Sequence, residues 1–94
     1  MEEQAYRIKG MSELDDTKIS YWKVLYGEES SPSSDNIWIL YIPGCGAGAL
    51  SNHYVEEHED GTITVTPSIL MTGHNKGMPT MRHGYITKGT WREV

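Results

Sequence analysis

The chain has 94 residues, of which 13 are acidic and 8 are lysine or arginine, so its formal net charge is −5. This length corresponds to one domain spanning residues 1–94. The negative charge argues against general binding of nucleic acid, which needs cations to neutralise phosphates. Cys45 is the only cysteine, which excludes a disulfide within the chain and favours a reducing compartment.

No segment of the sequence indicates export or membrane insertion. The N-terminal segment has two glutamates and no apolar run, so no signal peptide is expected. The longest apolar run, 37–42, is far shorter than the roughly 20 residues of a membrane helix. We therefore expect a soluble, cytoplasmic protein without a membrane partner. Its acidic residues are concentrated in the N-terminal part, 1–35, and its C-terminal part is basic from residue 73 onward.

Short runs of β-branched and aromatic residues, separated by polar or glycine-rich segments, predict a mostly β fold. At most a short helical turn is expected near the N-terminus, where Ser12 and Asp15 have the spacing of a capping box. About six or seven short strands are predicted, in a small antiparallel sheet or sandwich. In chain order they are 5–9, 18–26, 36–43, 52–57, 62–66 continuing at 69–72, 81–87 and 90–94.

The segments between these strands predict the turns. Segment 27–34 is polar, and Asp60-Gly61 and Lys88-Gly89 are typical of hairpin turns. Residues 44–50 are expected to form a glycine-rich turn after a strand that is apolar on both faces and stops at Pro43. Residues 73–80 are expected to form an exposed loop. Pro67 is expected to interrupt its strand by a bend, with the Ser68 hydroxyl satisfying a backbone group there.

The glycine run 44–48 lacks the Lys-Ser or Lys-Thr of a phosphate-binding loop, and no helix is predicted after it. Cys45 with a histidine is a possible nucleophile–base pair on paper, but no elbow motif or third orienting residue supports it. The acidic run 56–60 indicates either a solvated hairpin tip or a patch that faces a partner.

Cysteine and histidine side chains provide the metal-ligand candidates. The chain has Cys45 and four histidines, His53, His58, His74 and His83, but neither a C-x-x-C nor an H-x-x-x-H motif. Residues five apart on one regular strand point to opposite faces, which separates His53 from His58. The spacing alone therefore favours zinc only weakly.

Three blocks together resemble a family of small phage and prophage proteins. Ile39–Cys45 is similar to a strand ending in C-P-G-C, Gly61–Leu70 contains a T-P-S-I-L block, and Arg82–Trp91 is similar to a closing C-H-x-F-I-x-x-G hairpin. The resemblance covers residues 36–94 and implies a β domain built on a zinc knuckle.

This chain departs from the family pattern at the metal. Ile42 and Arg82 stand where the family has ligand cysteines, which leaves Cys45 and His83, with His74 as a further weak candidate. A structural zinc site needs four ligands. The resemblance therefore implies a degenerate knuckle in which no metal or other cofactor is expected and Ile42 fills the core.

Three hypotheses for function follow. The favoured one is a non-catalytic phage-type interaction protein that binds a host or phage protein, such as a nucleic-acid-binding host protein, in the cytoplasm of a bacterium. An inhibitor of a bacterial defence system, anti-CRISPR-like, is its specific case. The alternatives are a metal-binding structural module and a small hydrolase with a Cys-His pair. A homodimer is also expected, because a second subunit can cover strand edges in so short a chain.

Overall fold

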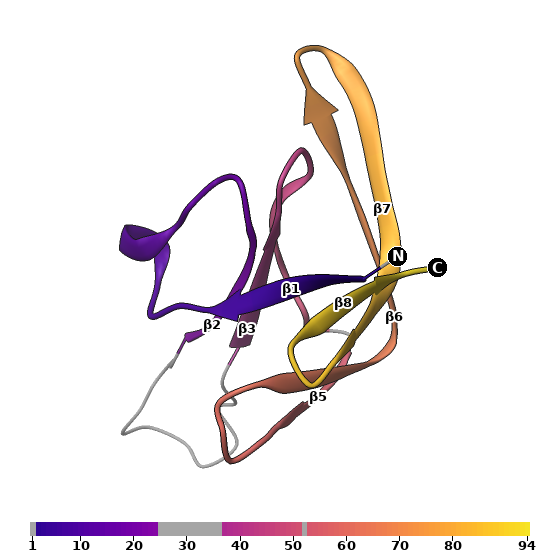
Figure 1. Cartoon of the computed structure of the whole chain (residues 1–94). Coiled ribbons are helices and arrows are strands. Elements are labelled where there is room, and N and C mark those ends of the chain that lie inside the picture. Colours follow the sequence, from indigo (N-terminus) through magenta and orange to yellow (C-terminus); the bar gives the residue numbers. More distant parts are fainter. Residues whose placement is uncertain (1, 25–36, 52) are drawn as a thin grey trace.

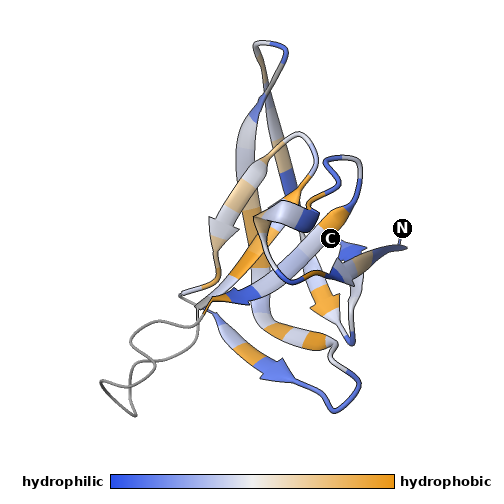
Figure 2. Cartoon of the chain, turned by 90° about the vertical axis from the view of Figure 1, so that its left-hand side faces the viewer, coloured by the Kyte–Doolittle hydropathy of each residue, from blue (hydrophilic) through white to orange (hydrophobic). Residues whose placement is uncertain are grey.

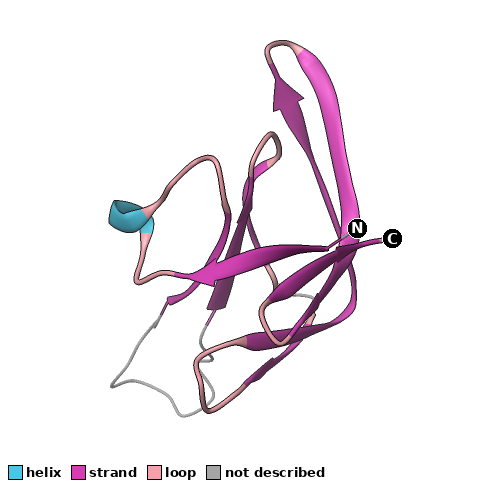
Figure 3. Ribbon diagram, in the orientation of Figure 1, coloured by secondary structure: helices cyan, strands magenta, loops and turns pink. Residues whose placement is uncertain are grey.

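The computed structural model describes residues 2–24, 37–51 and 53–94, and it shows the mostly β fold expected from the sequence (Figures 1 and 3). A 3-10 turn, η1 (Met11–Glu13), follows the first strand. Eight strands are present in the described residues, where the sequence predicted about six or seven. They are β1 (Glu2–Arg7), β2 (Ile19–Val24), β3 (Ile37–Ile42), β4 (Gly46–Ala49), β5 (Tyr54–Glu57), β6 (Ile63–Asn75), β7 (Met78–Thr87) and β8 (Thr90–Glu93).

The eight strands belong to one curled sheet with the order β4-β3-β2-β1-β8-β7-β6-β5. β1 is parallel to β2, and the remaining neighbours in this order are antiparallel. A parallel pair needs a crossover connection, and residues 8–18 with η1 provide it. Because β1 also pairs with β8, the strands of the acidic segment 1–35 lie in the middle of the sheet.

The core lies on the inner face of the curled sheet. Residues directly opposite each other on neighbouring strands share a face, and Ala5–Ile19 and Val65–Ile86 are such buried pairs. Hydrophobic bands therefore alternate with polar ones along the strands (Figure 2). Ile42 is fully buried in this core, as expected. The core cluster consists of Ala5, Ile19, Tyr21, Trp38, Leu40, Ile42, Leu50, Ile63, Val65, Ile69, Ile86 and Trp91.

The expected glycine-rich turn at 44–50 is mostly a strand. Pro43 and Gly44 occupy the centre of a tight turn, closed by a 2.9 Å hydrogen bond from the Cys45 N–H to the Ile42 carbonyl. Gly44 has a φ of 87°, which favours glycine at the third position of a type II turn. The chain then returns along β3 as β4. Glycine and alanine have low strand propensity, but backbone pairing with β3 forms the strand nevertheless.

The expected exposed loop at 73–80 is instead the end of a long hairpin. β6 and β7 remain paired up to Asn75 and Met78, and Lys76 and Gly77 connect them. Both connecting residues have positive φ, 54° and 81°, as a two-residue type I′ turn requires. The hairpin projects beyond the rest of the sheet and is hydrophilic at its tip (Figures 1 and 2).

The other turns largely follow the predictions. β5 and β6 form a hairpin around Asp60-Gly61, and β7 and β8 form one around Lys88-Gly89. The β6–β7 register shifts between Val65 and Ile69, which is the expected bend at Pro67. The helical turn forms, but its N-cap is Gly10 rather than Ser12. The end of the strand predicted at 18–26 and the polar loop predicted at 27–34 lie outside the described residues.

Among the described residues, no helix has the length and apolar character needed to span a membrane.

Candidate functional site

Cys45 is held by backbone and hydroxyl groups. Its Sγ lies 3.5 Å from the Met71 carbonyl oxygen and 3.7 Å from Thr80 Oγ1, and the side chain is half-buried. Gly73 packs directly against the Cys45 backbone, where an added Cβ would lie 2.5 Å from the Cys45 oxygen. These contacts fix the β3–β4 turn on the inner face of the β6–β7 hairpin.

Two of the histidines that the sequence singled out with Cys45, His74 and His83, lie on the other face of this hairpin. Gly73 faces Cys45, so the next residue of the strand, His74, points away from it. His83 pairs with Leu70, which alternates with Met71 and therefore also lies on the outer face. Among the described residues, no group of three or more His, Cys, Asp or Glu side chains is placed to hold a metal.

Ser68 contacts two histidines that are distant in sequence. Its Oγ lies 3.0 Å from His83 Nε2, and its carbonyl oxygen lies 3.0 Å from His53 Nε2. The expectation that the Ser68 hydroxyl satisfies a backbone group is therefore wrong, because the register shift at Pro67 brings Ser68 to the imidazole of His83. His83 is exposed, and no third residue in the described part of the chain orients this serine–histidine pair.

Arg82 is part of an ion pair on the inner face. Its Nε lies 3.1 Å from Glu93 Oε2 and its Nη2 lies 2.9 Å from Glu93 Oε1, while Glu3 accepts a further bond of 3.2 Å. The indole N–H of buried Trp91 donates to the same Glu93 at 2.7 Å. Hydrogen bonds from Arg82 lower the pKa of Glu93 to about 2. Arg82 thus joins β7, β8 and β1 at a position where the family resemblance implies a ligand cysteine.

Two carboxylates of the acidic run 56–60, those of Glu57 and Asp60, make hydrogen bonds within the protein. Glu57 accepts hydrogen bonds from Lys23 at 2.7 Å and Arg7 at 3.0 Å, which hold its pKa below the usual range. Asp60 accepts bonds from the backbone N–H and hydroxyl of Thr62, which close the turn. These contacts favour a structural role for the two carboxylates over a patch that faces a partner.

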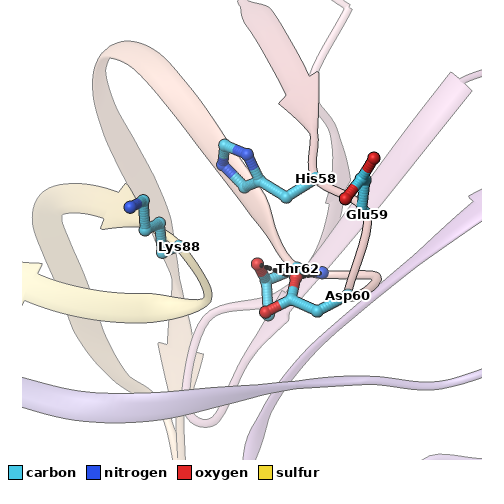
Figure 4. A pocket seen from close by; sticks show the side chains of 5 residues that line it. All are labelled: His58, Glu59, Asp60, Thr62 and Lys88. Carbon is cyan, nitrogen blue, oxygen red and sulfur yellow. Dashed lines mark hydrogen bonds between the residues drawn. The ribbon is translucent and has the colours of Figure 1, made fainter.

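A shallow depression of about 410 Å³ lies beside this acidic run. Lys88 reaches it from the β7–β8 turn, and the other four lining residues come from the β5–β6 turn (Figure 4). His58 Nε2 shares a 2.7 Å hydrogen bond with Thr64 Oγ1. Glu59 and Asp60 contribute negative charge to the lining of the depression, and Lys88 contributes positive charge. Because charges of both signs line the depression, it favours no single class of ligand.

The outer face of the β6–β7 hairpin carries large exposed apolar side chains. Leu70, Met81 and Tyr85 are 57%, 66% and 45% exposed, and the register places all three on the face that carries His83. The sequence analysis missed this face, although Met81 and Tyr85 stand four residues apart in the predicted strand 81–87 and therefore share one face of it. We refer to Leu70, Met81, His83 and Tyr85 as the outer hairpin face.

Comparisons with protein-family models, with curated proteins and with solved structures found no match for this chain.

Proposed function

We propose that this is a non-catalytic phage-type interaction protein that binds a host or phage protein through the outer hairpin face. One observation supports the proposal most directly: Leu70, Met81 and Tyr85 stay exposed side by side, while the core is complete on the opposite face. Apolar side chains that gather on one exposed face, rather than being scattered singly, indicate an interaction site.

The charges around the face support an apolar contact. No aspartate or glutamate occurs between Thr62 and Arg92, and the four residues of the outer hairpin face include no lysine or arginine. Depletion of charged side chains is the compositional signal of an interface centre. The partner that fits has an apolar groove wide enough for a projecting two-stranded hairpin.

An inhibitor of a bacterial defence system is the specific case that the overall charge supports. All 13 acidic residues lie outside the segment between Thr62 and Arg92. Once the hairpin is docked, the acidic remainder of the chain is available to a basic, nucleic-acid-binding surface of the same partner, since opposite potentials attract. The protein then acts in the cytoplasm of a bacterial host.

The test is capture of a partner with variants matched in exposure. Leu70→Asp and Met81→Asp place a carboxylate at the centre of the face without touching the core. Met11→Asp is the control, because Met11 is 63% exposed in η1, away from the hairpin. Each tagged variant is incubated with lysate of phage-infected bacteria, and the retained proteins are identified by mass spectrometry and then assayed as purified proteins.

We expect one partner that binds the unmodified chain and the Met11→Asp control with equal affinity. Binding should be at least about tenfold weaker for Met81→Asp, the usual effect of losing a central contact. Equal binding by all the variants excludes the outer hairpin face as the docking surface.

A further inference from the structure

Among the described residues, β4 is an edge strand of the sheet, and its pairing with β3 determines where its backbone groups point. The Leu50 N–H donates to the Trp38 carbonyl at 2.8 Å. Hydrogen-bonded pairs alternate along an antiparallel ladder. In this register, Gly48 opposite Leu40 and Gly46 opposite Ile42 are therefore hydrogen-bonded pairs as well. The residues between them, Ala47 and Ala49, therefore direct their N–H and C=O groups away from β3.

The two edges of the sheet differ in how they are protected. β5, the edge at the other end, carries Glu56 and Glu57, and the end of this strand is hydrophilic in Figure 2. Charged side chains are a common means of preventing an edge strand from pairing with another chain. β4 carries none, and both of its alanines are exposed. The whole segment 36–50 lacks charged side chains.

β4 is also fixed in place by contacts on its inner face. A Cβ at Gly48 would lie 3.4 Å from Met71 Sδ, so the strand lies close to the Met71 side chain of β6. Cys45, just before β4, contacts the Met71 carbonyl through its Sγ. An edge held in its bound shape loses little conformational entropy on pairing.

We propose that β4 pairs with β4 of a second copy of this chain across a two-fold axis, which makes one continuous sheet. When Gly48 lies opposite Gly48 of the second copy, Ala47 of each copy lies opposite Ala49 of the other. All the backbone groups that Ala47 and Ala49 direct away from β3 are then paired. A two-fold interface needs a surface that complements itself in this way.

The position of Gly48 favours a second copy over an unrelated extended segment. Gly48 lies on the axis, in the closely spaced type of pair where Cα atoms are about 4.5 Å apart, and a residue without a side chain fits there. The net charge of −5 opposes association of two copies, but segment 36–50 contributes nothing to that charge. The proposed interface is separate from the outer hairpin face.

Sedimentation velocity over a range of concentrations tests the proposal. We expect a dimer of twice 10.6 kDa for the unmodified chain. Ala49→Pro removes an N–H that does not pair with β3, and edge positions tolerate proline. Loss of one hydrogen bond per copy predicts dimerisation about thirtyfold weaker. Ala47→Glu should weaken it at least as much, whereas Thr87→Glu adds the same charge at an exposed strand position far from β4 and should not.

A second experiment locates the interface. Mixing isotope-labelled and unlabelled chains should give an intermolecular Hα–Hα contact at Gly48, which is absent in Ala47→Glu. A monomer at every concentration overturns the proposal. So does a dimer whose dissociation constant in both β4 variants equals that of the unmodified chain. A dimer without the Gly48 contact also overturns it. Thermal unfolding of each variant confirms that it remains folded.

Discussion

Glu93→Gln tests how much the ion pair with Arg82 stabilises the sheet. The carboxylate of Glu93 faces two nitrogens of Arg82 and the indole N–H of Trp91. Glutamine keeps the size of the side chain and an oxygen for Trp91, but it removes the negative charge. The change therefore isolates the charged part of the contact that joins β7 to β8.

The pKa of Glu93 gives the size of the effect. It falls from 4.5 to about 2, and about 2.5 pKa units are equivalent to about 3 kcal/mol. The Glu93 and Arg82 side chains are 31% and 27% exposed, so solvent screens part of this interaction. We expect Glu93→Gln to lower the free energy of unfolding at pH 7 by about 1–2 kcal/mol. For a domain of this size, each kcal/mol shifts the melting temperature by about 4–8 °C.

The pKa of Glu93 also determines how its contribution to the free energy of unfolding depends on pH. Because the carboxyl of Glu93 is more acidic in the folded state, its contribution is fully present above pH 4.5 and is lost as the pH falls toward about 2. Glutamine does not titrate, so the variant lacks this contribution at every pH. The difference between the two proteins should therefore be largest at neutral pH and small near pH 2.

Urea unfolding at pH 7, 4 and 2 measures this difference. Glu2→Gln is the matched control, because Glu2 pairs with Arg92 at 2.9 Å on the exposed side of the sheet. Exposed pairs contribute little, so the control should unfold like the unmodified chain. Equal stability of Glu93→Gln at pH 7, or an undiminished difference at pH 2, would refute the reasoning.

Three further substitutions and one metal determination test other parts of the structure. Ile42→Asp places a carboxylate at a fully buried position and should cost several kcal/mol in urea unfolding; an unchanged midpoint contradicts the core assignment. Gly84→Ala should cost about 1–3 kcal/mol, because its Cβ meets the Arg92 carbonyl and the Trp91 ring, whereas Gly10→Ala, in open space, should cost nothing measurable. Ser68→Ala removes the bond to exposed His83 and should lower stability by about 1 kcal/mol or less while leaving partner binding intact; loss of the partner at full stability makes Ser68 functional. Elemental analysis of protein purified without chelator should find less than one zinc per chain, and one zinc per chain would overturn the degenerate-knuckle hypothesis.

The hairpins that the sequence predicted have turns with a local signal. Asp60-Gly61 and Lys88-Gly89 supply residues that tolerate positive φ, and both turns form as expected. Lys76-Gly77 carries the same signal, but His74 and Pro79 beside it are poor strand formers, so the sequence indicated a loop. Backbone pairing between two long strands outweighs such weak preferences.

The contacts around the candidate sites depend on pairing between distant segments. Ser68 and His83 are fifteen residues apart, and only the shifted β6–β7 register brings them together. The position of β4 against β6 likewise depends on how the sheet curls. Burial of Ile42 was predictable because its strand is strongly apolar, whereas the separation of Cys45 from His74 and His83 required the face of each strand to be known.

The pairing of β1 with β8 affects how the chain folds during synthesis. Residues 2–4 pair with residues 90–92, so the two ends of the described chain lie side by side (Figure 1). While a ribosome is still adding β5 to β7, β1 has β2 as its sheet neighbour and an open edge on its other side. Contacts across such long sequence separations slow folding. β1 therefore gains its second neighbour in the sheet only after β8, the last strand in the chain, has been synthesised.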